Sequence, residues 1–417
     1  MPLFGSLFAH PRVLAPRWTF DAHSPLIAGA TAIIVGTSRA IILGTRDGRV
    51  LCLDDQGRER WSLRTGGKLG ETESWFVDEQ RVHAIDAPPV VMDIDADGRP
   101  EILIGTEQGT LYCIDASGRV KWTHDCGGQI RAAPCVADIN GDGALEVLIG
   151  SGNNRLTALT GKGEKLFEYQ GTAPVHSTPG VLQLPKRRIS LIIFGDDAGT
   201  LTAIKATQDV VWRVHLHTAI TASPSFFSDP EEERLVIGTQ AGIVACISEH
   251  GELVWQYKTL GSIYNAATIA DLDQDGKPEI IVGSCDNTVH VLTRDGKRLW
   301  TYAADFWITA TPLAADLDRD GMSEVIVGSY DHSLYILDGP GTYVMDYVPG
   351  ISGIINQAGH YGSVLTADVG EQTGKLRWKA TLSDMVIGCA LLPLADGIGI
   401  VASTKDGKVT LLTLKDA

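Results

Sequence analysis

The sequence of 417 residues has no apolar run near the roughly 18 residues that a membrane-spanning helix requires. It also has no basic stripe that could displace the counterions of a nucleic acid, since its formal net charge is −16. The seven cysteines include no CxxC pair, which argues against a disulfide framework or a zinc ribbon. We therefore expect a soluble protein that neither inserts into a membrane nor binds nucleic acid.

Signals for export and for catalysis are missing as well. Residues 1–16 lack the basic region, apolar stretch and small-residue cleavage site of a secretory signal, so the sequence predicts a cytoplasmic protein. No G-x-S-x-G elbow, H-E-x-x-H, phosphate loop or dinucleotide fingerprint occurs. The absence of these short motifs therefore favours a protein that is not an enzyme, although an active site can also be assembled from distant residues.

What the chain does have is internal repetition. Residues 88–122 and 133–167 match almost position for position at a period of 45, and residues 267–300 and 311–344 repeat the same pattern. Each unit contains four short runs rich in Val, Ile and Leu, bounded by Gly and Asp, which is typical of β-strands. Four strands in 40 to 45 residues is the spacing of a propeller blade.

The blades can be counted from the residue that ends each repeat unit. Seven units end at Trp61, Trp122, Phe167, Trp212, Trp255, Trp300 and Met345. Residues 386–414 supply three further strands without a closing tryptophan, and residues 17–22 match the missing fourth strand. We therefore predict an all-β fold over residues 1–417, a single eight-bladed β-propeller domain closed by the N-terminal strand completing the C-terminal blade.

Two segments fall outside the repeat, at about residues 66–81 and 346–380. The second contains TGKLRW, which resembles the last strand of a blade, so a ninth blade stays open as an alternative. Insertions in regular repeats form loops that often lie on the binding face. We expect both insertions on the one face that meets a partner.

Four repeats carry an acidic loop of nine residues between their first and second strands. Oxygen ligands on alternate residues, glycine at position six, a backbone carbonyl at position seven and an acid at position nine suit Ca²⁺. Asp, Asn and Gly also form ordinary turns, but four loops in register favour a metal site over that alternative. We predict up to four Ca²⁺ sites, with the ligands Asp93, Asp95, Asp97, Arg99, Glu101, Asp138, Asn140, Asp142, Ala144, Glu146, Asp271, Asp273, Asp275, Lys277, Glu279, Asp316, Asp318, Asp320, Met322 and Glu324.

The residues that precede the first strand of each blade are expected to face one mouth of the central channel. By register they are Asp86, Arg131, His176, Thr221, Tyr264 and Thr309, with Trp307 nearby. An acid, a base, an imidazole and aromatic rings could bind a sugar or a peptide, or perform acid–base chemistry. We predict a ligand site there, and a variable polar rim around a solvated channel is the alternative; the predicted ligand-binding residues are Asp86, Arg131, His176, Tyr264 and Trp307.

These motifs resemble two repeat families. The D-x-D-x-D-G-x-x-E loops, each followed by an apolar strand, resemble the FG-GAP/VCBS repeats of integrin-α-like propellers. The segments GTLYCIDASGRVKW and GSVLTADVGEQTGKLRW resemble the repeat of PQQ-binding-like, BamB-like propellers. The first resemblance implies structural calcium at the loops named above. A bound quinone is not implied, because the chain lacks adjacent cysteines and an export signal.

Together, these features predict a non-catalytic calcium-binding propeller that acts as a protein- or glycan-binding scaffold. The alternative is a polysaccharide lyase or hydrolase with its active site at the mouth of the channel, because some calcium-containing eight-bladed propellers are polysaccharide lyases. Exposed aromatic residues on the insertions would favour binding. A deep funnel that joins Arg131 and His176 to a carboxylate would favour catalysis.

Overall fold

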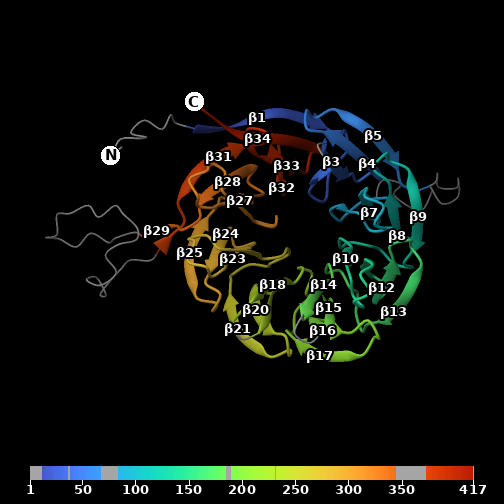
Figure 1. Cartoon of the computed structure of the whole chain (residues 1–417). Coiled ribbons are helices and arrows are strands. Elements are labelled where there is room, and N and C mark those ends of the chain that lie inside the picture. Colours follow the sequence, from blue (N-terminus) through green and yellow to red (C-terminus); the bar gives the residue numbers. More distant parts are fainter. Residues whose placement is uncertain are drawn as a thin grey trace, which may run out of the picture.

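A computed structural model describes residues 12–35, 38–66, 83–184, 189–230, 232–343 and 372–416, and within these ranges the chain forms strands and no helix. Eight sheets stand radially around a central channel, with the first strand of each sheet nearest the channel and the fourth at the rim (Figure 1). The prediction of an all-β, eight-bladed propeller is confirmed. None of the described residues belongs to a helix long and apolar enough to cross a membrane.

The first four blades follow one another without interruption of the strand order. Blade 1 contains β2 (Thr31–Val35), β3 (Ser38–Gly44), β4 (Arg49–Asp54) and β5 (Glu59–Arg64). Blade 2 contains β6 (Val90–Met92), β7 (Glu101–Gly105), β8 (Thr110–Ile114) and β9 (Val120–Asp125). Blade 3 contains β10 (Cys135–Ala137), β11 (Glu146–Ser151), β12 (Arg155–Thr160) and β13 (Lys165–Gln170). Blade 4 contains β14 (Gly180–Leu184), β15 (Ile189–Gly195), β16 (Thr200–Ile204) and β17 (Val210–His215).

The remaining blades include the two departures from simple order. Blade 5 contains β18 (Ser225–Ser228), β19 (Glu233–Gly238), β20 (Ile243–Ser248) and β21 (Leu253–Lys258). Blade 6 contains β22 (Thr268–Ala270), β23 (Glu279–Gly283), β24 (Thr288–Leu292) and β25 (Arg298–Ala303), extended at its rim by β30 (Gln372–Thr373) and β29 (Thr342–Tyr343). Blade 7 contains β26 (Leu313–Ala315), β27 (Glu324–Gly328), β28 (Ser333–Asp338) and β31 (Leu376–Thr381). Blade 8 contains β32 (Val386–Leu394), β33 (Gly397–Thr404), β34 (Lys408–Asp416) and β1 (Arg12–Asp21).

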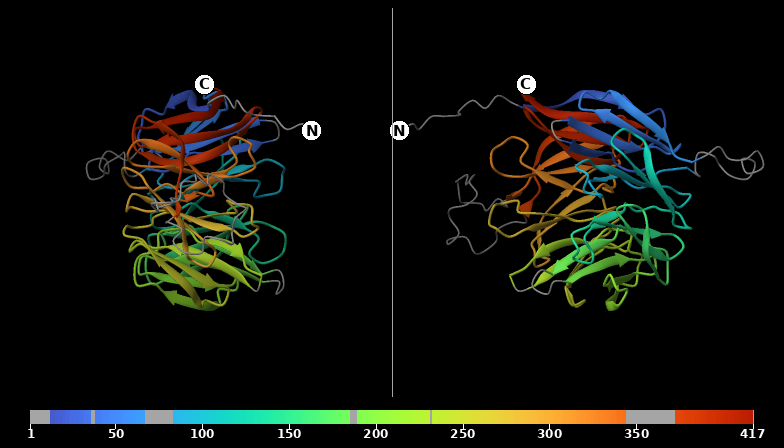
Figure 2. Two further views of the ribbon diagram at one scale, coloured as in Figure 1. Left: turned by 90° about the vertical axis from the view of Figure 1, so that its left-hand side faces the viewer. Right: turned by 45° about the vertical axis from the view of Figure 1, so that its right-hand side comes forward.

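The ring closes as predicted, because the N-terminal strand completes the C-terminal blade. β1 pairs antiparallel with β34 from Arg12 opposite Asp416 to Asp21 opposite Lys408, with a bulge between Pro16 and Trp18. The first strand and the last three strands of the chain thus share one sheet, where blue and red ribbons lie together in both views of Figure 2. This pairing covers the edge that β34 would otherwise expose.

The predicted count of eight blades holds, but the closing residue of blade 7 and the end of the second insertion were predicted wrongly. Met345 lies outside the described residues, and the fourth strand of blade 7 is instead β31, whose Trp378 stands opposite Ile336. The TGKLRW segment therefore belongs to blade 7 and not to a ninth blade, so the insertion predicted at residues 346–380 ends before Leu376. The error arose because residues 339–375 separate β28 from β31, and the regular spacing pointed to Met345 instead.

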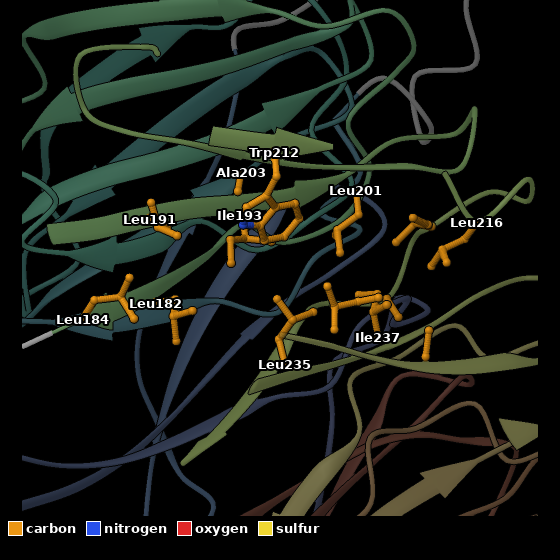
Figure 3. Packing of buried hydrophobic residues seen from close by; sticks show 14 residues of the cluster. Leu182, Leu184, Leu191, Ile193, Leu201, Ala203, Trp212, Leu216, Leu235 and Ile237 are labelled. Carbon is orange, nitrogen blue, oxygen red and sulfur yellow. The ribbon is translucent and has the colours of Figure 1, made fainter. Parts of the chain in front are cut away.

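The closing aromatic residue occupies one register in every blade. Trp300 stands opposite Val291, as Trp61 stands opposite Cys52, and a bulge follows at once. The indole of Trp212 packs between the sheets of blades 4 and 5, among Leu182, Leu201 and neighbouring aliphatic residues (Figure 3). The recurring aromatic residue and the apolar residue opposite it therefore build the core between adjacent blades.

Strand direction assigns each connection to one of two faces. Loops from the fourth strand of one blade to the first strand of the next, such as residues 126–134, lie with the hairpins between second and third strands on the face that we name the upper face. Loops between first and second strands, and hairpins between third and fourth strands, lie on the opposite, lower face. The expectation that both insertions share one face concerns residues outside the described ranges; the first insertion follows β5, the fourth strand of blade 1, and the second follows β28, the third strand of blade 7.

Candidate functional site

Backbone hydrogen bonds hold every interblade loop at the upper face. In the loop that leads into blade 3, the N–H of Ile130 donates to Thr106 O of blade 2 at 3.1 Å, and the N–H of Gly152 donates to Gln129 O at 2.9 Å. The second of these bonds recurs in all eight blades, with the donors Arg46, Glu107, Gly152, Asp197, Gln240, Cys285, Tyr330 and Lys405. Each loop is thereby held to the blade it enters, which places the residue two positions after the bonded carbonyl at the channel mouth.

A cavity of about 460 Å³ opens at this mouth, within the size range of small-molecule sites. Four of the five residues predicted to bind a ligand line it: Asp86, Arg131, His176 and Tyr264. The side formed by blades 2 to 5 is polar and includes Thr221, Asp197 and Gln240. The opposite side, from blades 8 and 1, is apolar and includes Ile387, Ile27, Ala28 and Gly29. The cavity is therefore amphipathic.

Trp307, the fifth predicted residue, does not line the cavity. Its carbonyl accepts the recurring hydrogen bond, here from Tyr330 N–H at 2.9 Å, so it lies two residues before the channel-mouth position that Thr309 occupies. Its ring is exposed and stacks on Phe306 with the centroids 5.1 Å apart. Trp307 is thus part of an exposed aromatic surface on the upper face.

Two carboxyl groups and a guanidinium form one polar group at the cavity wall. Arg131 Nε donates to Glu107 Oε1 at 2.7 Å, and Asp86 shares a hydrogen bond with Glu107. Burial, with the hydrogen bond and negative charge of Glu107, raises the pKa of Asp86 to about 7. Although burial opposes it, hydrogen bonds from Asp86 and Arg131 hold the pKa of Glu107 below its ordinary value. Near neutral pH the pair therefore shares one proton, carried by Asp86 for much of the time.

Beside them, His176 Nδ1 lies 2.9 Å from Asp197 Oδ2. A carboxylate accepts, so Nδ1 carries the proton of this hydrogen bond, and Nε2 is an acceptor when the ring is neutral and a donor when it is protonated. His176 Nε2, Asp197 Oδ1, Asp86 Oδ1 and Thr221 Oγ1 are buried and without a hydrogen-bond partner. These four atoms belong to residues that line the same cavity.

Glu107 and Asp197 were missed from the sequence. Both come from the hairpin between second and third strands, at the second residue after the glycine that ends strand two, in GTEQG and GDDAG. The same register places Gln240 in the cavity wall. Aligning these hairpins as well as the interblade loops would have identified all three.

A larger cavity, about 630 Å³, lies away from this site, between blades 7 and 8. Two of its cationic residues are paired: Arg17 contacts Asp396, and Arg12 lies 3.8 Å from Asp416. We assign no role to it.

The four acidic loops of the lower face share one hydrogen-bond pattern. In blade 2, Asp93 Oδ2 accepts from Gly98 N–H at 2.9 Å and Asp97 Oδ1 accepts from Arg99 N–H at 2.8 Å. The buried Glu101 accepts from Ile94 N–H through Oε2 at 3.1 Å. The equivalent bonds occur in the other three loops, with glycine at φ between +81° and +94° in position six.

Some of the second oxygens also accept, as Asp93 Oδ1 does from Asp97 N–H at 3.1 Å. In three loops one oxygen from each of three acidic residues lies within 4.8 Å of the others: Asp93, Asp95 and Glu101; Asp271, Asp273 and Asp275; Asp316, Asp318 and Asp320. In the blade 3 loop, Asn140 Nδ2 instead donates to Asp142 Oδ2 at 3.0 Å. A set of carboxylate, amide and carbonyl oxygens on one tight loop fits a hard cation such as Ca²⁺.

The loops differ in whether a side chain from the fourth strand neutralises them. Lys121 Nζ lies 2.6 Å from Asp95 and 2.9 Å from Glu101 in blade 2. Arg377 contacts Asp318, Asp320 and Glu324 in blade 7 at 2.8, 3.1 and 2.5 Å. The same position, directly before the closing aromatic residue, is Leu166 in blade 3 and Leu299 in blade 6. Two loops thus contain a built-in cation from strand four and two have leucine there.

Burial raises the pKa of the acid at position nine, as Glu279 and Glu324 show. Burial, aided by Asp273 and Asp275, raises the pKa of Glu279 to about 7. Burial and the charge of Asp318 likewise raise the pKa of Glu324 to about 7, even though Arg377 is beside it. A cation bound among these oxygens would offset the cost of keeping such carboxylates ionised.

Comparisons with known proteins agree with a β-propeller fold. Residues 98–208 match the family described as outer membrane protein assembly factor BamB, and residues 234–349 match the family described as the lambda-carrageenase β-propeller domain. The crystal structure of BamB from Moraxella catarrhalis is 17% identical, with 97% of this chain and 99% of that chain covered and a TM-score of 0.64.

Two further structures are more distant. BBS1N in complex with ARL6DN, in crystals soaked with mercury or with lead, is 12% identical, covers 78% of this chain and 91% of that chain, and gives TM-scores of 0.51 and 0.52. No curated protein matches the sequence. The FG-GAP/VCBS resemblance stays a prediction. The fold and the repeat sequences together show a propeller similar to that of BamB.

Proposed function

We propose that this chain is a calcium-stabilised propeller that acts as a binding scaffold, with its upper face presented to a protein or glycan partner. The proposal rests on the observation that the acidic loops and the cavity lie on different faces of the ring. The acidic loops, with their shared backbone geometry, lie on the lower face, whereas the cavity and the exposed rings of Phe306 and Trp307 lie on the upper face. Metal binding would therefore rigidify the ring without obstructing the binding surface.

The similar structures support a scaffold in general terms. One of them, BBS1N, was solved in complex with another protein, ARL6DN, and the matched BamB family is described as an assembly factor. A rigid ring that offers one face to a partner suits such a role. A cytoplasmic location stays a prediction.

Substitution of the residue directly before the closing aromatic residue tests whether the acidic loops bind calcium. Lys121→Leu should weaken the metal-free protein, because Asp95 and Glu101 lose their ammonium partner, yet should tighten calcium binding at blade 2 about tenfold, since displacing partly exposed ion pairs costs about 1–2 kcal/mol. Leu299→Lys should do the reverse at blade 6. Calorimetric titration of both variants and the wild type with calcium measures this.

Because the two substitutions should change the calcium affinity in opposite directions, each variant is a control for the other. Equal calcium affinities in Lys121→Leu, Leu299→Lys and wild type would contradict ligation by these loops. A decrease in both variants would indicate general damage to the blades, which the melting temperatures would reveal.

Catalysis is a second candidate, favoured by one specific observation: Arg131 and His176 share a cavity with two carboxyl groups, Asp86 and Asp197, and Arg131 is bonded to a third, Glu107. A lyase would leave an unsaturated product that absorbs ultraviolet light, and a hydrolase would release new reducing ends. We expect neither when the wild type is incubated with neutral and acidic polysaccharides. A product that forms with wild type and is lost in His176→Gln would overturn the scaffold proposal in favour of an enzyme.

A further inference from the structure

We propose that the cavity at the upper mouth of the channel binds a neutral, hydroxyl-rich sugar unit of a glycan. The inference rests on the scaffold function proposed above, and it narrows the partner from protein or glycan to glycan. It depends on which atoms in the cavity lack a partner, on the charge balance there, and on the apolar wall.

The first step concerns unpartnered atoms. The described part of the chain contains eight buried side-chain nitrogen or oxygen atoms without a hydrogen-bond partner, and four of them belong to cavity residues: Asp86 Oδ1, His176 Nε2, Asp197 Oδ1 and Thr221 Oγ1. A buried polar group without a partner is unfavourable, because it has given up its hydrogen bonds to water. Four of them gathered around one accessible cavity indicate groups that are completed by something bound there.

The second step concerns the chemistry of the missing partner. Asp197 Oδ1 accepts hydrogen bonds, so the ligand must donate; His176 Nε2 accepts as well when the imidazole is neutral. Thr221 both donates and accepts, and so does Asp86 when it carries the proton that its raised pKa retains near pH 7. A hydroxyl group offers one donor and two acceptor sites, which matches this mixture, whereas an ammonium group offers donors alone.

The third step concerns charge. Arg131 is the one lysine or arginine among the described residues that line the cavity, and its guanidinium is bonded to Glu107 at 2.7 and 3.5 Å. An acidic sugar would have to face Asp86 and Asp197 while competing with Glu107 for Arg131. A neutral ligand avoids both costs.

The fourth step concerns shape. Ile27, Ala28, Gly29 and Ile387 form an apolar wall, and the half-exposed ring of Tyr264 stands on the rim. A sugar ring presents C–H groups on one surface and hydroxyl groups around its edge. Such a ring can place its C–H surface on the apolar wall while its hydroxyls reach the polar side of the cavity.

Thr221→Val, paired with Thr309→Val, tests the inference. Thr309 holds the same register position in blade 7 and does not line the cavity. The probes are soluble oligosaccharides of neutral galactan, mannan and glucan, together with a uronic-acid polymer, a sulfated galactan and spermidine, each titrated into the full chain. We expect a neutral oligosaccharide to bind, Thr221→Val to weaken it about tenfold, and Thr309→Val to leave it unchanged.

The melting temperature separates a binding role from a structural one. The Thr221 hydroxyl has no partner in the fold, so valine should leave the melting temperature unchanged or raise it. Binding of the acidic polymers or spermidine alone would overturn the inference, as would equal affinities of the two variants. If no oligosaccharide binds while calcium still stabilises the protein, the inference fails and the scaffold proposal stands; loss of the calcium response would count against the scaffold proposal instead.

Discussion

Millimolar calcium should raise the melting temperature of chelator-stripped protein by a large margin. Each site contributes about 2.7 kcal/mol when free calcium is a hundredfold above its dissociation constant, so four independent sites would add on the order of 10 kcal/mol. Without a metal the carboxylates of each loop repel one another, and Glu279 is buried beside Asp273 and Asp275. Differential scanning calorimetry with and without calcium measures the effect.

Magnesium is the matched control for this result. It requires near-ideal octahedral geometry at shorter distances and gives up its water reluctantly, so it should stabilise these open loops much less than calcium. Elemental analysis of the dialysed protein should then find metal at up to four equivalents. An unchanged melting temperature, together with no bound metal, would refute calcium binding and leave the propeller without its proposed stabilising ions.

Removal of residues 1–21 should destabilise the protein by more than about 4 kcal/mol, beyond the cost of most single substitutions. This truncation removes β1, which pairs with β34 from Arg12 to Asp21, and with it the half-buried Trp18 and Phe20 that pack in the core between blades 8 and 1. It also removes the bond from Trp18 Nε1 to Asp55 O at 2.9 Å. The exposed edge of β34 should promote association between truncated chains.

Two further measurements make this result specific to ring closure. A chain that lacks only residues 1–11, which precede β1, should melt like the full chain. A synthetic peptide of residues 12–22, added to the longer truncation, should restore the melting temperature and the monomeric state. If the chain without residues 1–21 melts within a few degrees of the full chain and stays monomeric, closure by β1 is unnecessary for stability.

The repeat made the architecture predictable, because one register recurs in every blade. Trp122 opposite Cys113 and Trp255 opposite Cys246 obey the same pairing rule, which can be read from spacing alone. The rule failed where spacing failed: the long connection between β28 and β31 moved the fourth strand of blade 7 to Trp378. A chain segment of arbitrary length does not alter the strand pairing on either side of it, so regular spacing could not locate β31.

The candidate site was only partly predictable for a related reason. Residues of the interblade loops, such as Asp86 and His176, share one register and could be aligned. Their partners Glu107 and Asp197 come from a second set of loops, and their role depends on side-chain contacts of 2.7 to 2.9 Å that spacing does not specify. Trp307 was predicted as a ligand-binding residue because it is near the register position of Thr309, but it lies two residues before that position and does not line the cavity.

The hydrogen bonds that hold the interblade loops use backbone atoms alone. The N–H of Glu107 and the carbonyl of Ala84 would form the same bond whatever side chains stood at the channel mouth. Natural variation or laboratory selection can therefore exchange the residues at these eight positions, one blade at a time, without dismantling the ring beneath them. In this molecule the capacity to acquire a new specificity is separate from the capacity to fold, and a library of variants at the channel mouth should consist largely of folded proteins.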